Sequence, residues 1–125
     1  MAIVTALGTV QAKTTGLIAI DTVATYAVGD WVIVVFAGDV TPPSAPYVSG
    51  LGASGGNLTL VKDVEAVNTG NVLLSIWSGK VLTAGSNKSI YANGTDAFAI
   101  AAYKATGLVA TPFDKSATAV NTGTA

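Results

Sequence analysis

Residues that favour turns interrupt this chain so often that little room is left for a long helix. Gly, Asn, Pro and Asp separate short runs of Val, Ile, Thr and aromatic residues, and no stretch repeats apolar residues at helical spacing. Glu occurs once and Arg is absent, so two good helix formers are nearly missing. This punctuation is typical of all-β folds. We predict a single antiparallel β-sandwich over residues 1–125, of jelly-roll or immunoglobulin-like type, with long connecting loops and extended termini.

Two pairs of runs are expected to form hairpins. Residues 58–67 should pair with residues 72–77 across the turn at 68–71. Asn93-Gly94 lies between the runs 89–92 and 96–103, and Asn-Gly is the strongest short hairpin signal. At the ends of the chain, residues 1–12 are interpreted as an N-terminal arm or a first strand, and residues 111–125 as a C-terminal strand or tail.

The run from Trp31 to Phe36 is apolar at every position. Successive side chains of a strand point to opposite sides, so this strand is expected to be buried on both faces. A two-layer sandwich covers only one face of each sheet. The second face therefore needs a cover, which a loop, an arm or another subunit could supply.

Sparse charge supports the same expectation. Charged residues make up 10% of the chain, the hydrophobic share is 50% and the net charge is −1. A surface with so few charges either aggregates or is covered by a partner, and we favour a partner.

Nucleic acid is not expected, because binding it needs clustered cations and the six positive charges are scattered Lys residues. The longest apolar run, Trp31–Ala37, is too short for a membrane helix. The N-terminus lacks the basic start of a signal peptide, so synthesis in the cytoplasm is expected.

The residues that usually carry out catalysis are missing. The chain has no His, no Cys and no Arg, so we expect no enzyme, no catalytic residue, no cofactor and no metal site. The cluster Gly52-Ala-Ser-Gly-Gly56 lacks the spacing of a nucleophile motif and is interpreted as a turn. Asp63 and Glu65 stand two apart, which on a regular strand places both on one face, and we interpret them as a solvated edge. Asp30 is predicted to bond to backbone N–H groups in a turn.

The order of the segments resembles that of a β-sandwich family encoded by tailed phages. An apolar strand leads into Gly-Asp and a fully hydrophobic strand; later a strand ends in Ile-Trp, an Ala-Gly turn follows, and an Ala-rich strand ends in Tyr. The segments are Leu17–Ile20, Tyr26–Ala37, Asn71–Trp77, Val81–Gly85, Ala97–Tyr103 and Thr111–Asp114. With the Ser, Ala and Thr residues that follow Asp114, the resemblance covers about residues 17–120. The resemblance supplies no catalytic or metal residue.

Members of that family occur as capsid decoration (cement) proteins and in phage tails and fibres. The resemblance therefore implies a virion protein on the capsid exterior that forms homo-oligomers, commonly trimers, and binds the major capsid protein. Alternatives are a tail, fibre or baseplate component and, from another class, a carbohydrate-binding module that uses exposed aromatic residues. The candidate interface residues are Ile3, Val4, Leu7, Trp31, Pro42, Pro43, Pro46, Tyr47, Trp77 and Tyr103.

Overall fold

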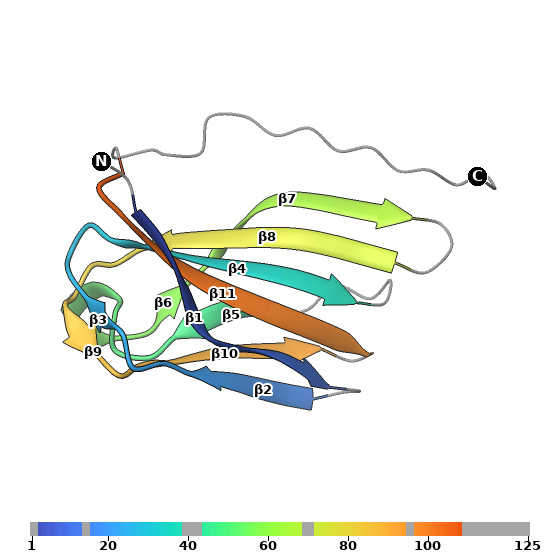
Figure 1. The fold of residues 1–125 in the computed structure, drawn as a ribbon, viewed down its shortest axis with the longest axis horizontal. Coiled ribbons are helices and arrows are strands. Elements are labelled where there is room, and N and C mark those ends of the chain that lie inside the picture. Colours follow the sequence, from blue (N-terminus) through green and yellow to red (C-terminus); the bar gives the residue numbers. More distant parts are fainter. Residues whose placement is uncertain (1–2, 14–15, 39–43, 69–71, 95–96, 109–125) are drawn as a thin grey trace.

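The structure, a computed structural model, describes residues 3–13, 16–38, 44–68, 72–94 and 97–108. The described residues form two antiparallel sheets and a small two-stranded one (Figure 1). The five-stranded sheet contains β1 (Ile3–Lys13), β11 (Phe98–Thr106), β4 (Trp31–Gly38), β8 (Val72–Lys80) and β7 (Val61–Asn68), in that order. The four-stranded sheet contains β2 (Gly16–Asp21), β10 (Ser89–Gly94), β5 (Ser44–Val48) and β6 (Leu58–Thr59). The all-β sandwich predicted from the sequence is confirmed.

The strand order is that of a jelly roll. The first strands pair with the last ones in reverse order: β1 with β11, β2 with β10, β4 with β8, and β5 with β6. This is the pattern of a long hairpin wrapped into two facing sheets. Strand β7 is an additional strand at the edge of the larger sheet, beyond β8. The topology therefore decides between the two predicted sandwich types in favour of the jelly roll.

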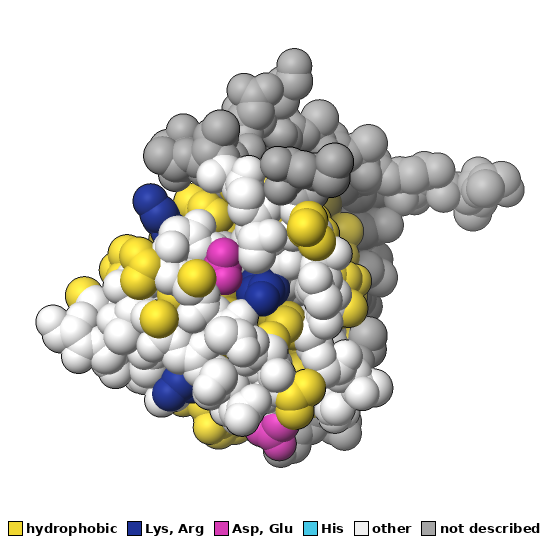
Figure 2. All heavy atoms as spheres, turned by 60° about the vertical axis from the view of Figure 1, so that its left-hand side comes forward, with side chains coloured by type: hydrophobic (Ala, Val, Ile, Leu, Met, Phe, Trp, Pro, Cys, Tyr) yellow, Lys and Arg dark blue, Asp and Glu magenta, His cyan; other side chains and the backbone are white. Residues whose placement is uncertain are grey.

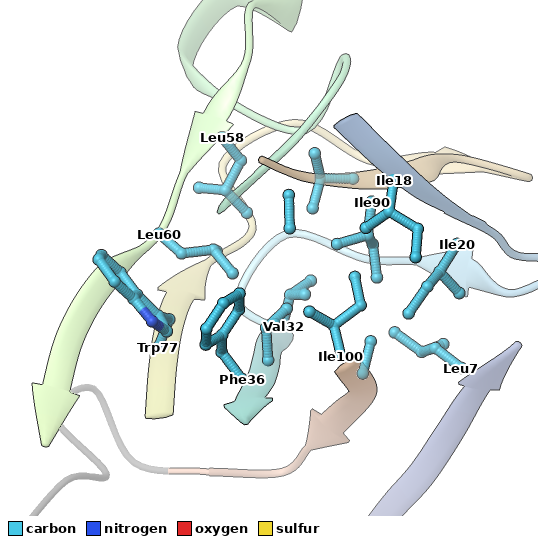
Figure 3. Close-up of a cluster of buried hydrophobic side chains, with 14 of the residues drawn as sticks. Leu7, Ile18, Ile20, Val32, Phe36, Leu58, Leu60, Trp77, Ile90 and Ile100 are labelled. Atoms are coloured by element: carbon cyan, nitrogen blue, oxygen red, sulfur yellow. The ribbon is translucent and has the colours of Figure 1, made fainter. Parts of the chain in front are cut away.

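The hydrophobic core fills the space between the two sheets (Figure 3). Alternate residues of β4 lie in it, since Val32, Val34 and Phe36 are fully buried. The Phe36 ring stacks on Phe98, with ring centroids 5.1 Å apart. The facing sheet contributes Ile18, Ile20, Val48, Leu58 and Ile90.

Two segments cross between the sheets where the sequence suggested otherwise. The predicted hairpin at Asn93-Gly94 is wrong: both residues belong to β10 in the four-stranded sheet, whereas β11 lies in the five-stranded sheet. The predicted strand over residues 58–67 is divided, because β6 and β7 lie in different sheets and the chain changes sheet at Leu60. The remainder of the expected pairing, residues 61–67 with residues 72–77, is confirmed in β7 and β8.

Short elements close one end of the sandwich. Strands β3 (Thr25–Tyr26) and β9 (Gly85–Ser86) pair there, near a 3₁₀ turn at Ala53–Gly55. Asp30 accepts a hydrogen bond from the Ala27 N–H at 2.9 Å, which confirms its role as a turn residue. Among the described residues, none belongs to a helix with the length and hydrophobicity needed to cross a bilayer.

Candidate interaction surface

The outer face of the five-stranded sheet, which points away from the core, is the candidate functional surface. Directly opposed residues of neighbouring strands share a face, so the register identifies its members. One row runs through Ala101, Val35, Ile76 and Val64 on four successive strands. A second row contains Ala6, Tyr103, Ile33, Ser78 and Val61, and the flanking rows add Val4, Ala105, Trp31, Ala12, Ala99, Ala37, Leu74 and Ala66. The face is almost entirely apolar.

Charge is confined to the margins of this face. Among the described residues, Lys80 lies at the end of the row through Trp31, and Asp63 lies at a bulge in β7. When one face of a sheet meets water, the residues on that face are normally polar or charged and alternate along each strand with apolar core residues. Here Trp31, Ile33 and Val35 take those positions and are only half-buried. The second apolar side of the β4 strand, predicted from the sequence, is therefore present in the fold.

A hollow of about 270 Å³ opens on this face at its Trp31 end. It is lined by Val4, Trp31, Ile33, Asp63, Ile76, Ser78, Ala105 and Leu108. The Ser78 hydroxyl donates a hydrogen bond to the Asp63 carboxylate, which ties down the charged side chain of the lining. The Trp31 indole N–H is buried and has no acceptor within the described part of the chain. A buried donor without an acceptor costs about 1–3 kcal/mol. A second molecule that places an oxygen acceptor here would therefore form a more stable complex.

Several predicted interface residues belong to this face or adjoin it. Val4, Trp31 and Tyr103 are members of the outer face, and Val4 is 62% exposed. Ile3 lies beside them at the end of β1 and is 57% exposed. Leu74 and Ile76 were not among the candidate interface residues, and Ile33 and Val35 entered only as part of the apolar run Trp31–Phe36. The alternation of all four with core residues was the available signal.

Other predicted interface residues are not available to a partner. Leu7, Pro46 and Trp77 are buried inside the sandwich, and Leu7 and Trp77 are part of the hydrophobic core. The Trp77 indole N–H donates to the buried Ser75 hydroxyl at 2.9 Å, and Lys62 covers its ring. Large apolar residues such as these are common in protein–protein contacts, but their positions in the strand register point these side chains inward. Pro42 and Pro43 lie outside the described residues.

The two acidic residues of β7 do not share a face. A register shift between Lys62 and Val64 inserts Asp63 as an extra residue in the strand. Asp63 therefore bonds to Ser78 on the outer side, whereas Glu65 pairs with Lys62 at 3.0 Å on the opposite side. The expectation of a common face is wrong because the bulge breaks the alternation. Within the described ranges, no cluster of three or more His, Cys, Asp or Glu side chains could hold a metal ion.

Tyr47 lies on the opposite side of the molecule, on the outer face of the four-stranded sheet. It is directly opposed to Tyr91, and the two rings stack with centroids 5.1 Å apart and an interplanar angle of 24°. One face of each ring is thus occupied by the other ring. Both residues are half-buried.

Comparisons with models of known protein families, with curated proteins and with solved structures found no match. The surface is therefore interpreted from its own residues and geometry.

Proposed function

We propose that this chain is a non-enzymatic structural subunit that assembles by packing the apolar outer face of its five-stranded sheet against another copy of itself. The observation that carries the proposal is the continuous apolar row across that sheet, Ala101, Val35, Ile76 and Val64. Burying such a face is favourable in proportion to the apolar area removed from water. Small Ala and Val side chains allow a close, flat contact between sheets.

The available chemistry supports assembly rather than catalysis. The chain contains no His, no Cys and no Arg, which removes the usual general bases, thiol nucleophiles and guanidinium clamps. Among the described residues that line the Trp31 hollow, Asp63 is the one carboxylate, and it accepts a hydrogen bond from the neighbouring Ser78. This arrangement suits a contact that excludes water.

The setting that we propose is a phage particle. The resemblance of the segment order to phage structural β-sandwiches supports a capsid decoration role, in which copies of the chain, as trimers, bind the major capsid protein on the exterior of the shell. The jelly-roll topology is compatible with this role, since viral shell domains use it among other proteins. A tail, fibre or baseplate component would use the same surface.

A matched pair of substitutions tests the self-association. Ala101→Glu places a carboxylate in the apolar row, at its β11 end, whereas Ala19→Glu places one at an exposed position of β2 in the other sheet. We expect Ala101→Glu to weaken association by about tenfold or more, because a buried unpaired charge costs well over 1.4 kcal/mol. Ala19→Glu should have no effect. Sedimentation equilibrium gives the dissociation constants, and thermal melts verify that both variants fold.

Two results would contradict the proposal. A wild-type protein that remains monomeric at high concentration would refute self-association. Equal association constants for the two Glu variants would exclude the outer face as the contact. Incubation with undecorated phage capsids, followed by imaging, tests the capsid setting separately from the self-association.

The stacked Tyr47 and Tyr91 make the carbohydrate-binding alternative less favourable. Sugar platforms offer open ring faces, and here each tyrosine ring uses one face on its neighbour. A glycan array gives the direct check: binding that is lost in Tyr91→Ala and retained in Ala101→Glu would favour the carbohydrate-binding function.

A further inference from the structure

Strand β1 leaves one edge of the five-stranded sheet open. It pairs with β11 on one side, and within the described part of the chain no strand pairs with its other side. Half of the backbone N–H and C=O groups of an edge strand point away from its neighbour, so the edge can template another strand. Its first residues are accessible, since Ile3, Val4, Thr5 and Ala6 are all exposed.

The residues of this edge carry none of the usual protection against pairing. Native edge strands are commonly blocked by charged side chains, by proline or by bulges. Residues 1–12 contain no charged residue and no proline, and the regular pairing with β11 runs unbroken from Ile3 to Leu7. Figure 2 shows one end of the molecule, where Lys, Asp and Glu side chains are scattered singly among uncharged ones.

The other edges among the described strands are protected. Strand β7, at the opposite edge of the same sheet, has the bulge at Asp63 and the charged residues Lys62 and Glu65. In the other sheet, β6 has only two residues, and the second half of β1 lies against β2. The contact with β2 is close at Gly8, where an added Cβ would come within 2.5 Å of Ile20. The unprotected edge is thus limited to Ile3–Leu7.

A hollow, too small to hold a whole strand, lies beside this edge. Its volume is about 200 Å³, and it separates Thr5–Gly8 from the segment Thr22–Ala24. Val23 stands on the far side of the hollow and is 94% exposed. A strand added along the edge would cover Ile3 and Val4.

We propose that the Ile3–Leu7 edge of β1 pairs antiparallel with the same edge of a second copy and joins the two five-stranded sheets into one. The proposal rests on the self-association proposed above and adds a two-fold contact to it. Because a three-fold trimer contains no two-fold axis, this contact would join copies from two different trimers. A two-fold axis at Thr5 brings the two Thr5 residues opposite each other and sets Val4 against Ala6 of the partner copy. Val4 and Ala6 belong to the outer face, so the apolar face continues across the joint.

Single cysteines test this register, because the chain has no cysteine of its own. Directly opposed residues of antiparallel strands have Cα atoms about 4.5–5.5 Å apart, within the range that a disulfide bridges. We expect Thr5→Cys to form disulfide dimers readily in air, as seen on non-reducing gels. The matched control Thr59→Cys, exposed on β6, should remain monomeric under the same conditions. Val4→Cys mixed with Ala6→Cys should give mixed dimers faster than either variant alone.

The outcomes separate this contact from the outer-face contact. Cross-linking of Thr5→Cys that is no faster than that of Thr59→Cys would overturn the proposal. Cross-linking that appears only after removal of residues 109–125 would also overturn it, since the chain's own C-terminal segment would then occupy the edge. Introducing Ala101→Glu into the Thr5→Cys variant tests the two contacts independently: dimers that persist support the edge even if the outer face plays no part. Association that survives Thr5→Lys but not Ala101→Glu would leave the outer face alone as the contact.

Discussion

At the scale of single residues, a buried hydrogen-bonded pair illustrates how this core accommodates polar groups. Tyr26 is among the largest fully buried side chains, and its hydroxyl lies 2.7 Å from the hydroxyl of Thr22. Thr22 also donates to the Lys88 carbonyl at 2.7 Å, so the Tyr26 O–H is left to donate to Thr22. This chain of bonds ties the end of β2 to the residue preceding β10, and it satisfies both buried hydroxyls.

The pH dependence of stability should reveal Tyr26. Burial raises the pKa of its phenol above the ordinary value of 10.0, and the Thr22 hydroxyl, which can turn to donate to a phenolate, offsets part of this rise. Because the folded state holds the proton more tightly, the contribution to stability is complete below pH 10.0 and is lost as pH rises through the folded-state pKa. Urea unfolding at neutral and alkaline pH measures the loss. Tyr26→Phe should show a smaller loss than wild type, and equal losses would contradict the assignment.

At the scale of elements, the bend in β1 determines how the two sheets are joined. Pairing with β11 is regular up to Leu7 and resumes at Gln11, and Gly8 adopts a left-handed conformation with φ of +62°. The extra residues let the strand turn away from β11 and approach β2 (Figure 1). A glycine is required at this bend, because a side chain would collide with Ile20 and the Asp21 carbonyl.

Substitution at this bend should destabilise the fold. Gly8→Ala combines an unfavourable positive φ, about 1–2 kcal/mol, with a Cβ only 2.5 Å from Ile20, so we expect a total loss of about 2–4 kcal/mol. Gly55→Ala is the matched control, since Gly55 has φ of +78° and no atom within 4 Å of the added Cβ. It should lose only the conformational part. Chemical denaturation measures both, and equal losses would show that the contact with Ile20 is unimportant.

At the scale of the whole molecule, the distribution of charge separates the two surfaces that we propose for assembly from the rest of the chain. The few charged side chains lie mainly outside them: Lys62 and Glu65 pair with each other on the inner side of β7, and Lys104 donates to the Thr25 carbonyl. The outer face and the β1 edge are apolar over most of their described residues. Assembly through them would be driven by the hydrophobic effect and backbone pairing rather than by ion pairs.

The salt dependence of association checks this view. Salt screens charge pairs but leaves hydrophobic contacts unchanged or stronger. We expect the dissociation constant of the wild-type protein to change by less than about threefold, or to fall, between low salt and about 1 M salt. Light scattering across that range provides the measurement. A steep weakening with salt would mean that ion pairs hold the copies together.

Much of this fold is determined by local sequence. Alternation along a strand is local: it grouped Phe98 with Ile100 on one face, and it predicted that the Trp31–Phe36 strand has two apolar faces. Which face of each strand points into the core was not predictable from it. The β7–β8 hairpin and the turn at Asp30 were predictable because their signals are local too. The turn residues between short β-prone runs, together with the absence of helix periodicity, indicated an all-β sandwich.

The tertiary structure alone decided what depends on contacts between distant residues. Pairing between segments far apart in sequence determines the jelly-roll order and the change of sheet at Leu60. It also makes Asn93 and Gly94 part of strand β10 instead of a turn, and no local turn signal specifies such pairing. The same holds for the candidate surface. Trp31 and Trp77 are equally hydrophobic, yet the register turns Trp31 outward and Trp77 into the core, and the bulge at Asp63 separates it from Glu65. Side-chain chemistry thus determined that an apolar surface would exist, and strand pairing determined where it lies.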